Sequence, residues 1–214
     1  MQFIYEPALT PTLTITNDNY KYLIKVRRFK ENEIINITDF QQIFEYKITN
    51  ITKKSVTLIQ QKSIPLPPKL KPFHIGWCKI DPKNIEKVLP TLNEIGVTKI
   101  TFINCDRSQG NFKIKLDRIQ KILINSNQQC GRIEIMEIDF CENLDKFLVK
   151  HPNAKICDFG GNNITEYFEV GVVGCEGGFS EREKKLFKNI VAFDTPLILK
   201  SESAVVALAS KVLL

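Results

Sequence analysis

The sequence lacks the features that mark several protein classes. None of its apolar runs approaches the roughly 20 residues of a transmembrane helix. The N-terminal segment MQFIYEPALT has no basic stretch followed by an apolar one, so it does not resemble a signal peptide. Two histidines and six cysteines without a C-x-x-C pair give none of the usual spacings of a zinc site. We therefore expect a cytoplasmic protein with no membrane-spanning segment and no metal site.

The cysteines are widely spaced, and most stand beside apolar residues. Cys78 follows Trp77, and Cys157 follows Ile156. This pattern is typical of reduced cysteines in a hydrophobic core, and we expect that state for all six. Neither histidine is expected to be catalytic.

The composition is that of an ordinary globular protein, but the charge is unevenly distributed. Of 214 residues, 43% are hydrophobic and 25% are charged, and Lys+Arg 30 against Asp+Glu 24 gives a net charge of +6. Residues 1–72 hold 11 basic and 6 acidic side chains, or +5, which leaves +1 for the rest. Such an excess indicates either a polyanionic partner, such as nucleic acid or a membrane surface, or a solvated lysine-rich face.

A proline-rich connector divides the chain. Residues 64–72 (IPLPPKLKP) contain four prolines, which cannot continue a helix or a central strand. Before the connector, alternating and β-branched runs predict strands, and one helix is expected at about Asp18–Phe29. The expected strands are Gln2–Tyr5, Glu33–Thr38, Ile43–Asn50 and Ser55–Gln61. A small, mostly β domain follows.

After the connector, strands alternate with helices. Asp81 and Pro82 are typical of a helix start, and Gly96 of a helix end. This alternation predicts an α/β domain with a mostly parallel sheet and helices on both faces. The expected strands are Phe73–Ile80, Val97–Asn104, Ile133–Ile138, Ala154–Phe159, Gly171–Val173 and Ile190–Phe193. Helices are expected at Lys115–Gln129, at Glu142–Lys150, and from Ser180 and Ser201 onward.

Two glycine-rich segments follow predicted strands. In residues 171–183 (GVVGCEGGFSERE), a β stretch runs into a glycine-rich turn, and Ser180 with Glu183 forms a capping box. Residues 160–163 (GGNN) would make a second loop. Ligands of open α/β sheets bind at the carboxyl ends of strands. The loops therefore predict either a small-molecule pocket or two structural turns.

Ser201 is predicted to cap the last helix. The apolar residues Ala204, Val205, Leu208, Ala209 and Val212 form one stripe on that helix. The stripe is suited to closing the core or to pairing with a second subunit, and closing the core is the default expectation.

Several segments, in order along the chain, resemble motifs of one family. Residues 93–97 (NEIGV) are similar to its E-L-G-V, residues 105–108 (CDRS) to S-E-R, and residues 128–132 (QQCGR) to E-Q-[SC]-x-R. Residues 174–180 (GCEGGFS) are close to G-P-E-G-G-[FL]-[ST], residues 199–204 (LKSESA) to L-R-T-E-T-A, and residues 25–29 (KVRRF) to R-V-L-R. The chain thus resembles, over nearly its whole length, the ribosomal RNA small subunit methyltransferase E family of the SPOUT class.

The resemblance implies a fold and an activity. The fold would be a PUA-like RNA-binding β-barrel over residues 1–68 and a trefoil-knotted α/β methyltransferase domain over residues 69–214. The activity would be S-adenosylmethionine-dependent methylation of N3 of a uridine in the 16S rRNA of the small ribosomal subunit, carried out by a homodimer.

The resemblance also implies site residues. Arg107, Arg132 and Lys200 are the catalytic candidates, since cations would stabilise negative charge on the uracil or hold an RNA phosphate. The candidates for RNA binding are Lys25, Arg27, Arg28, Lys53 and Lys54. The cofactor would be held by Phe159, Gly160, Val173, Gly174, Cys175, Glu176, Gly177, Gly178, Ile198, Leu199, Ser201 and Ser203.

Three departures from the family pattern keep other functions open. Cys175 stands in place of a proline, Lys200 in place of an arginine, and Thr91 in place of a lysine. Lysine keeps the charge but loses the planar bidentate fork of arginine. One alternative is therefore a catalytically weakened RNA-binding or ribosome-assembly module of the same fold. A second is an RNA ribose 2′-O methyltransferase.

Overall fold

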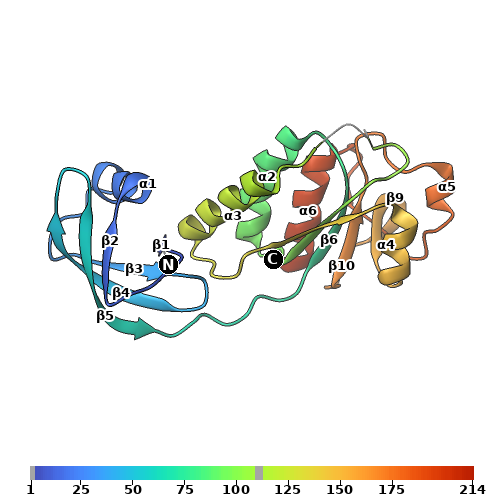
Figure 1. Ribbon diagram of the computed structural model, residues 1–214. Coiled ribbons are helices and arrows are strands. Elements are labelled where there is room, and N and C mark those ends of the chain that lie inside the picture. Colours follow the sequence, from blue (N-terminus) through green and yellow to red (C-terminus); the bar gives the residue numbers. More distant parts are fainter. Residues whose placement is uncertain (1–2, 109–112) are drawn as a thin grey trace. The chain divides into compact units, whose positions relative to one another are not determined.

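The computed structural model describes residues 3–108 and 113–214 and forms two compact units (Figure 1). The first unit comprises Met1–Lys69 with Asn127–Ile135, and the second comprises Leu70–Ser126 with Met136–Leu214. The first unit's main segment thus ends next to the expected boundary at residue 68. Residues 127–135, expected in the second domain, pack with the first unit.

The first unit is built on a five-stranded sheet in the order β1-β3-β4-β5-β2. β1 runs parallel to β3, and the other pairs are antiparallel. Leu23, Ile37, Ile48 and Leu58 are completely buried in its core. β2 was not expected from the sequence, and Gln2 of the first expected strand lies outside the described residues. The strands are β1 (Ile4–Tyr5), β2 (Thr12–Ile15), β3 (Ile34–Thr38), β4 (Ile43–Ile51) and β5 (Val56–Ile64).

The expected helix at Asp18–Phe29 is instead two short segments. A four-residue α-helix, α1 (Asn17–Tyr20), continues into a π-helical segment, η1 (Lys21–Val26). The wider turn is visible in the bond from the Arg27 amide to the Tyr22 carbonyl, at 2.9 Å. Arg28 then has φ 60, a left-handed conformation that stops the helix before Phe29.

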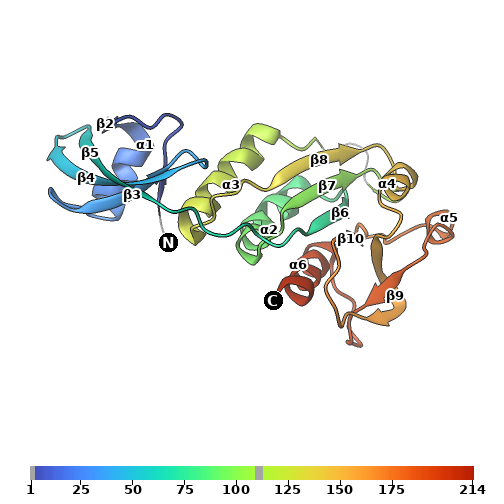
Figure 2. The same ribbon diagram turned by 90° about the horizontal axis from the view of Figure 1, so that it is seen from below.

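The second unit contains a six-stranded sheet in the order β11-β9-β10-β6-β7-β8, and all of its strand pairs are parallel (Figure 2). The parallel sheet is thereby confirmed. The strand expected at Ile133–Ile138 starts later, at Glu137, because residues up to Ile135 belong to the first unit. The strands are β6 (His74–Cys78), β7 (Lys99–Ile103), β8 (Glu137–Cys141), β9 (Lys155–Asn163), β10 (Val170–Val173) and β11 (Ile190–Ala192).

Helices cover both faces of this sheet, as two close approaches at glycines show. A Cβ added to Gly76 would lie 2.7 Å from Phe147 of α4 (Leu144–Lys150). A Cβ added to Gly171 would lie 2.9 Å from Leu208 of α6 (Ser201–Leu213). Gly171 is in register with Ile75, so it faces the side opposite to Gly76. Figure 1 shows α4 and α6 on opposite sides of these strands. The other helices are α2 (Pro82–Ile95), α5 (Glu181–Lys184) and α3 (Leu116–Cys130), of which residues 127–130 are assigned to the first unit.

Three of the four helix ends that were predicted from local sequence signals are found in the structure. Asp81 accepts a hydrogen bond from the Lys83 amide, and Gly96 ends α2 with φ +109. Ser180 with Glu183 forms the expected capping box. The prediction that Ser201 caps α6 is wrong. The N-cap position belongs to Lys200, and Ser201 is the first helical residue.

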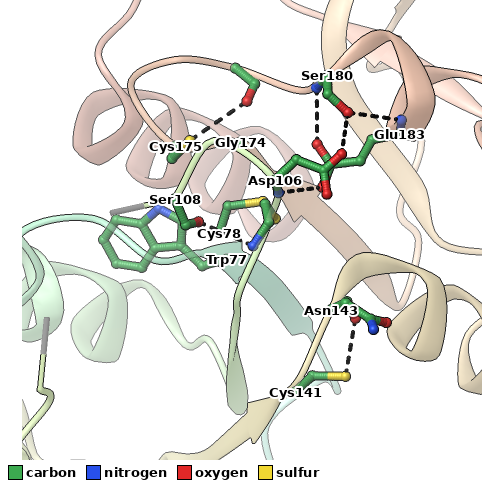
Figure 3. The surroundings of a disulfide bond; sticks show 12 residues. Trp77, Cys78, Asp106, Ser108, Cys141, Asn143, Gly174, Cys175, Ser180 and Glu183 are labelled. Atoms are coloured by element: carbon green, nitrogen blue, oxygen red, sulfur yellow. Dashed lines mark hydrogen bonds between the residues drawn. A yellow bond between two sulfur atoms is a disulfide. The ribbon is translucent and has the colours of Figure 1, made fainter. Parts of the chain in front are cut away.

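The expectation of six reduced cysteines is wrong for one pair. Cys78 and Cys105 form a disulfide with a Cα–Cα distance of 5.5 Å (Figure 3). β6 and β7 are neighbours, and Cys78 is in register with Ile103, two residues before Cys105. The disulfide therefore joins the ends of two adjacent strands. Of the four free cysteines, Cys175 is buried as expected, whereas Cys130 is exposed and its expected core position is wrong. Cys157 is half-buried, and burial raises the pKa of its thiol to about 12.

Candidate functional site

A cavity of about 360 Å³ lies in the second unit, where three chain segments meet. The first segment belongs to β9, the second follows β10, and the third runs from the end of β11 into α6. Two of them therefore begin at carboxyl ends of parallel strands, the usual location of ligand sites in such sheets. The lining residues are Cys157, Asp158, Phe159, Gly160, Val173, Gly174, Cys175, Glu176, Gly178, Phe179, Ala192, Phe193, Thr195, Leu197, Ile198, Leu199, Lys200, Ser201 and Ala204.

The second segment, residues 173–179, takes its shape from its glycines, and we call it the glycine segment. The Gly178 amide donates to the Cys175 carbonyl at 2.9 Å, which closes a tight turn, and Gly178 has φ +63. A side chain at Gly174 would crowd the Phe179 ring, 3.2 Å from the added Cβ. The backbone of this segment therefore forms the cavity wall directly, with few side chains between it and a ligand.

The segment at Gly160–Asn163 is not the loop that was expected. It is the last part of β9, and Asn162 is in register with Val191 of β11. Gly161 allows this pairing, because a Cβ there would lie 2.6 Å from the Val191 backbone. Gly160 has φ +76, and nothing lies within 4 Å of a Cβ added to it. The strand therefore presents open backbone to the cavity.

Ser201 connects the cavity wall to the core of the sheet. Its Oγ accepts a hydrogen bond from the Trp77 indole N–H at 2.9 Å and donates to the Gly174 carbonyl at 2.5 Å. Trp77 is fully buried in β6, and Ser201 is buried at the start of α6. The hydroxyl thus fixes the glycine segment relative to both the sheet and the last helix.

The rim of the cavity is unusually apolar for exposed residues. Phe159 is 73% exposed, Leu197 70% and Ile198 80%, and all three line the cavity. Exposed apolar side chains gathered around a hollow are typical of ligand sites. Charged side chains also line it, namely Asp158, Glu176 and Lys200. The arrangement suits a ligand with an apolar, planar part and polar ends.

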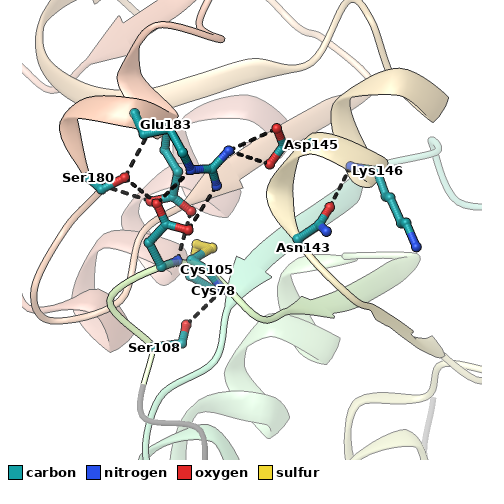
Figure 4. Close-up of polar contacts among 10 residues, drawn as sticks. Cys78, Cys105, Ser108, Asn143, Asp145, Lys146, Ser180 and Glu183 are labelled. Atoms are coloured by element: carbon teal, nitrogen blue, oxygen red, sulfur yellow. Dashed lines mark hydrogen bonds and ion pairs between the residues drawn. A yellow bond between two sulfur atoms is a disulfide. The ribbon is translucent and has the colours of Figure 1, made fainter.

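A network of polar residues holds residues 105–108 against the glycine segment (Figure 4). Arg182 donates to both carboxylate oxygens of Asp106, at 2.8 and 3.0 Å, and to Asp145 at 2.9 Å. The Asp106 carboxylate also accepts from Ser180, and its amide donates to buried Glu183. Hydrogen bonds from Arg182 and Ser180 lower the pKa of Asp106 to about 2. The network is therefore charged across the physiological range.

Arg107 projects from the loop that this network holds. Its Nη1 donates to the Gly177 carbonyl at 2.8 Å, and its side chain lies against Gly177. The guanidinium is exposed and has further N–H donors, so it can bind an anion while it holds the glycine segment.

The predicted site residues divide into three groups. Ten of the twelve cofactor candidates line the cavity, and so does Lys200. Gly177 and Ser203 do not line it, but Gly177 contacts Arg107. Arg132 belongs to the first unit, where its Nε donates to the Glu134 carbonyl at 2.7 Å and burial lowers its pKa to about 10.

Sequence reasoning missed several lining residues. Asp158 precedes the predicted Phe159, and Phe193, Thr195 and Leu197 lie on the segment before α6. The motif at residues 199–204 pointed to the later part of this segment, but no motif marked Phe193, Thr195 or Leu197 themselves.

The RNA-binding candidates all lie in the first unit and are exposed. Lys25, Arg27 and Arg28 lie in and directly after η1, and Lys53 and Lys54 form the turn between β4 and β5. No helix in the described part of the chain is long and apolar enough to cross a bilayer. Within residues 3–108 and 113–214, no cluster of three His, Cys, Asp or Glu side chains is arranged to hold a metal.

Comparison with known proteins identifies the family. The model of an RNA methyltransferase domain matches residues 67–213, and that of an RNA methyltransferase PUA domain matches residues 15–61. The ribosomal RNA small subunit methyltransferase E of Helicobacter pylori strain J99 is 40% identical over 222 residues, which is 98% of each chain. The chain belongs to this methyltransferase family. The first unit thus contains its PUA domain, and the second carries its methyltransferase domain.

Solved structures share the fold of this family member. The ribosomal RNA small subunit methyltransferase E of Neisseria gonorrhoeae, bound to S-adenosyl methionine, has a TM-score of 0.76 at 21% identity and covers 98% of this chain and 95% of its own. A putative methyltransferase of Legionella pneumophila, in complex with the same cofactor, has a TM-score of 0.75 at 23% identity, with 97% and 95% covered. The chain therefore has the fold of these solved structures.

Proposed function

We propose that the protein transfers a methyl group from S-adenosylmethionine to N3 of a uridine in the 16S rRNA of the small ribosomal subunit. The observation that carries the proposal is the 360 Å³ cavity with its glycine wall and apolar rim, in a chain of the ribosomal RNA methyltransferase family. Two relatives of the same fold are described as bound to this cofactor.

The residues of the cavity fit this cofactor. Its adenine is planar with apolar faces, and Ile198 and Leu199 offer these faces an apolar slot. Open backbone at Gly160 and Gly178 lets main-chain groups approach its polar atoms. Asp158 is suited to ribose hydroxyls, because a carboxylate accepts hydrogen bonds from them. Glu176 is proposed to organise the glycine segment rather than to act as a general base.

When bound, the cofactor supplies an activated methyl group on a sulfonium sulfur. The protein's main task is then alignment, which is worth several orders of magnitude in rate. Uracil N3–H is a weakly acidic imide, and negative charge develops on N3 and its flanking carbonyls as the N3 proton passes to solvent and the methyl group moves from sulfur to N3. We propose that Arg107 and Lys200 stabilise this charge, as preorganised cations do in many enzymes. Arg132 is proposed to contribute from the first unit, by holding RNA.

The RNA would be gripped by the PUA domain. Lys25, Arg27, Arg28, Lys53 and Lys54 would contact phosphates, which fixes position without reading sequence. The target uridine must be unstacked, since N3 is buried in a Watson–Crick pair. We further propose that the protein is a cytoplasmic homodimer with a trefoil knot in its methyltransferase domain. Light scattering tests the dimer, which should have twice the mass of one chain.

The test uses small ribosomal subunits from a strain that lacks the gene. The protein is incubated with these subunits and S-adenosylmethionine, and the rRNA is analysed by mass spectrometry and reverse transcription. We expect one methylated uridine that stops the polymerase, because an N3-methyl group blocks pairing. The variant Ala204→Trp fills the cavity and should abolish methylation, whereas Val149→Trp, at an exposed position of the same unit, should not.

Two results would overturn the assignment in different ways. A methyl group that leaves reverse transcription intact but protects the RNA backbone from alkali would indicate ribose 2′-O methylation. RNA binding without cofactor binding would indicate the weakened assembly module. The departures from the family pattern at Cys175 and Lys200 favour the weakened assembly module over the ribose methyltransferase, because both residues line the cavity.

A further inference from the structure

A second hollow, of about 130 Å³, lies in the first unit. It is bounded by η1 and the residues after it on one side and by β1 and β3 on the other. Its lining residues are Phe3, Ile4, Tyr22, Leu23, Arg27, Phe29, Ile34, Ile35 and Asn36. A hollow of this size holds one planar heteroaromatic ring rather than a whole nucleotide.

The hollow offers aromatic and apolar surface. Tyr22 and Phe29 are half-buried against the core of the unit, so their rings are held in place but remain accessible. Ile34, on β3, is 55% exposed. Fixed aromatic rings at a surface are the usual platforms on which proteins stack unpaired bases.

The segment that bounds one side of the hollow is basic, although Glu31 and Glu33 follow it before Ile34. Residues 21–30 (KYLIKVRRFK) contain five lysines and arginines and no acidic residue. The Arg27 guanidinium lies 6.0 Å from the centre of the Phe29 ring. Arg28 is held in a left-handed conformation, φ 60, directly beside the hollow's Phe29. The charge therefore favours a polyanion over an apolar peptide as the occupant.

Polar groups that could bind a base edge also line the hollow. The structure shows no hydrogen bond from the Tyr22 hydroxyl or the Asn36 side-chain amide to another described residue. A hydroxyl and an amide together offer both donors and acceptors, which is what a base edge presents.

The backbone around the hollow is irregular. The π-helical turns of η1 place Tyr22 and Arg27 five residues apart across one hydrogen bond, and both line the hollow. Such π-helical turns occur preferentially at functional sites.

We propose that this hollow binds one unpaired base of the RNA substrate, stacked on Phe29. This inference rests on one part of the proposed function, namely that the substrate is RNA. It assigns to the first unit a contact with a base, in addition to phosphate contacts. The surrounding cations hold the neighbouring phosphates, while the hollow selects single-stranded over paired RNA, because a paired base cannot enter it.

The experiment measures binding of the full-length protein to a fluorescently labelled single-stranded RNA of about 15 nucleotides, and to the same RNA in a duplex, over a series of salt concentrations. Phe29→Leu keeps the apolar volume but removes the stacking face. It should weaken single-strand binding about tenfold, the size of one base–aromatic stack, with an unchanged salt slope and unchanged duplex binding. Asn36→Ala should act in the same direction, by a smaller factor.

Two variants serve as controls. Ile59→Ala removes an exposed apolar side chain of the same unit that does not line the hollow, and should leave binding unchanged. Arg28→Ala should reduce the salt slope by about 0.7, the value of one phosphate contact to a single strand. A cooperative thermal unfolding transition, measured for every variant, would establish that the variant is folded.

The proposal is overturned if folded Phe29→Leu and Asn36→Ala both bind the single strand like the unaltered protein. It is also overturned if they weaken single-strand and duplex binding equally, since that would indicate a general change of the surface. Cofactor binding to the second unit is measured separately, so failure of the base site is distinguishable from failure of the proposed methyltransferase activity.

Discussion

The Ser201→Ala substitution tests how the cavity wall is held. In the folded protein, Ser201 Oγ is the partner of the Trp77 indole N–H and of the Gly174 carbonyl, and all three residues are buried. Alanine leaves both groups without a partner. A buried polar group that loses its partner costs about 1–3 kcal/mol, and alanine returns about 0.5 kcal/mol through helix propensity. Because two groups lose their partner, we expect a loss of about 1.5–5.5 kcal/mol in the free energy of unfolding.

Urea unfolding followed by tryptophan fluorescence measures this loss directly. Trp77 is the single tryptophan of the chain, so the signal reports on the second unit and on the residue that loses its partner. Ser203→Ala is the matched control, the same replacement at an exposed position of the same helix, and its stability should change by less than about 0.5 kcal/mol. If Ser201→Ala were as stable as Ser203→Ala, Ser201 would not hold the wall as described.

Three further predictions follow from single contacts of the second unit. Gly161→Ala should separate β9 from β11 and lower stability by more than about 1 kcal/mol, seen as a lower midpoint in urea, because its Cβ would lie 2.6 Å from the Val191 backbone. Burial, aided by a neighbouring histidine, lowers the pKa of His74 to about 4. The unfolded chain therefore takes up a proton first as the pH falls from about 6.5 to about 4, and stability should fall by about 2 kcal/mol over that range; His74→Gln should flatten the pH profile. Reducing the Cys78–Cys105 disulfide, which spans a sequence separation of 27, should cost about 3 kcal/mol in urea unfolding; equal stability with and without reductant would contradict it.

Features set by neighbouring residues were predictable from the sequence. The cap at Asp81, the left-handed Gly96 and the capping box at Ser180 each depend on side chains within a few positions, and the structure shows all three. The parallel sheet follows from the alternation of strands and helices, which is also local in the chain. The motif resemblance reached the family in the same way, through short segments in order.

Features set by distant residues were not predictable. Ser201 was predicted to be a helix cap. Its hydroxyl instead accepts a hydrogen bond from the indole of Trp77, which lies 124 positions away in the sequence. The disulfide became visible only once β6 and β7 were known to be neighbours. The helix expected up to Phe29 ends early because the backbone of Arg28 has a left-handed conformation. Such a conformation is usually marked by a glycine, and the sequence has none at this position.

Calorimetric titration of the protein with S-adenosylmethionine tests the central claim most directly. The account predicts one cofactor bound per chain by the unaltered protein and by Val149→Trp, and no binding by folded Ala204→Trp, because the tryptophan fills the cavity. Absence of binding to the unaltered protein at millimolar cofactor, or equal binding by Ala204→Trp, would contradict the assignment of the cavity between the glycine segment and α6 as the methyl-donor site.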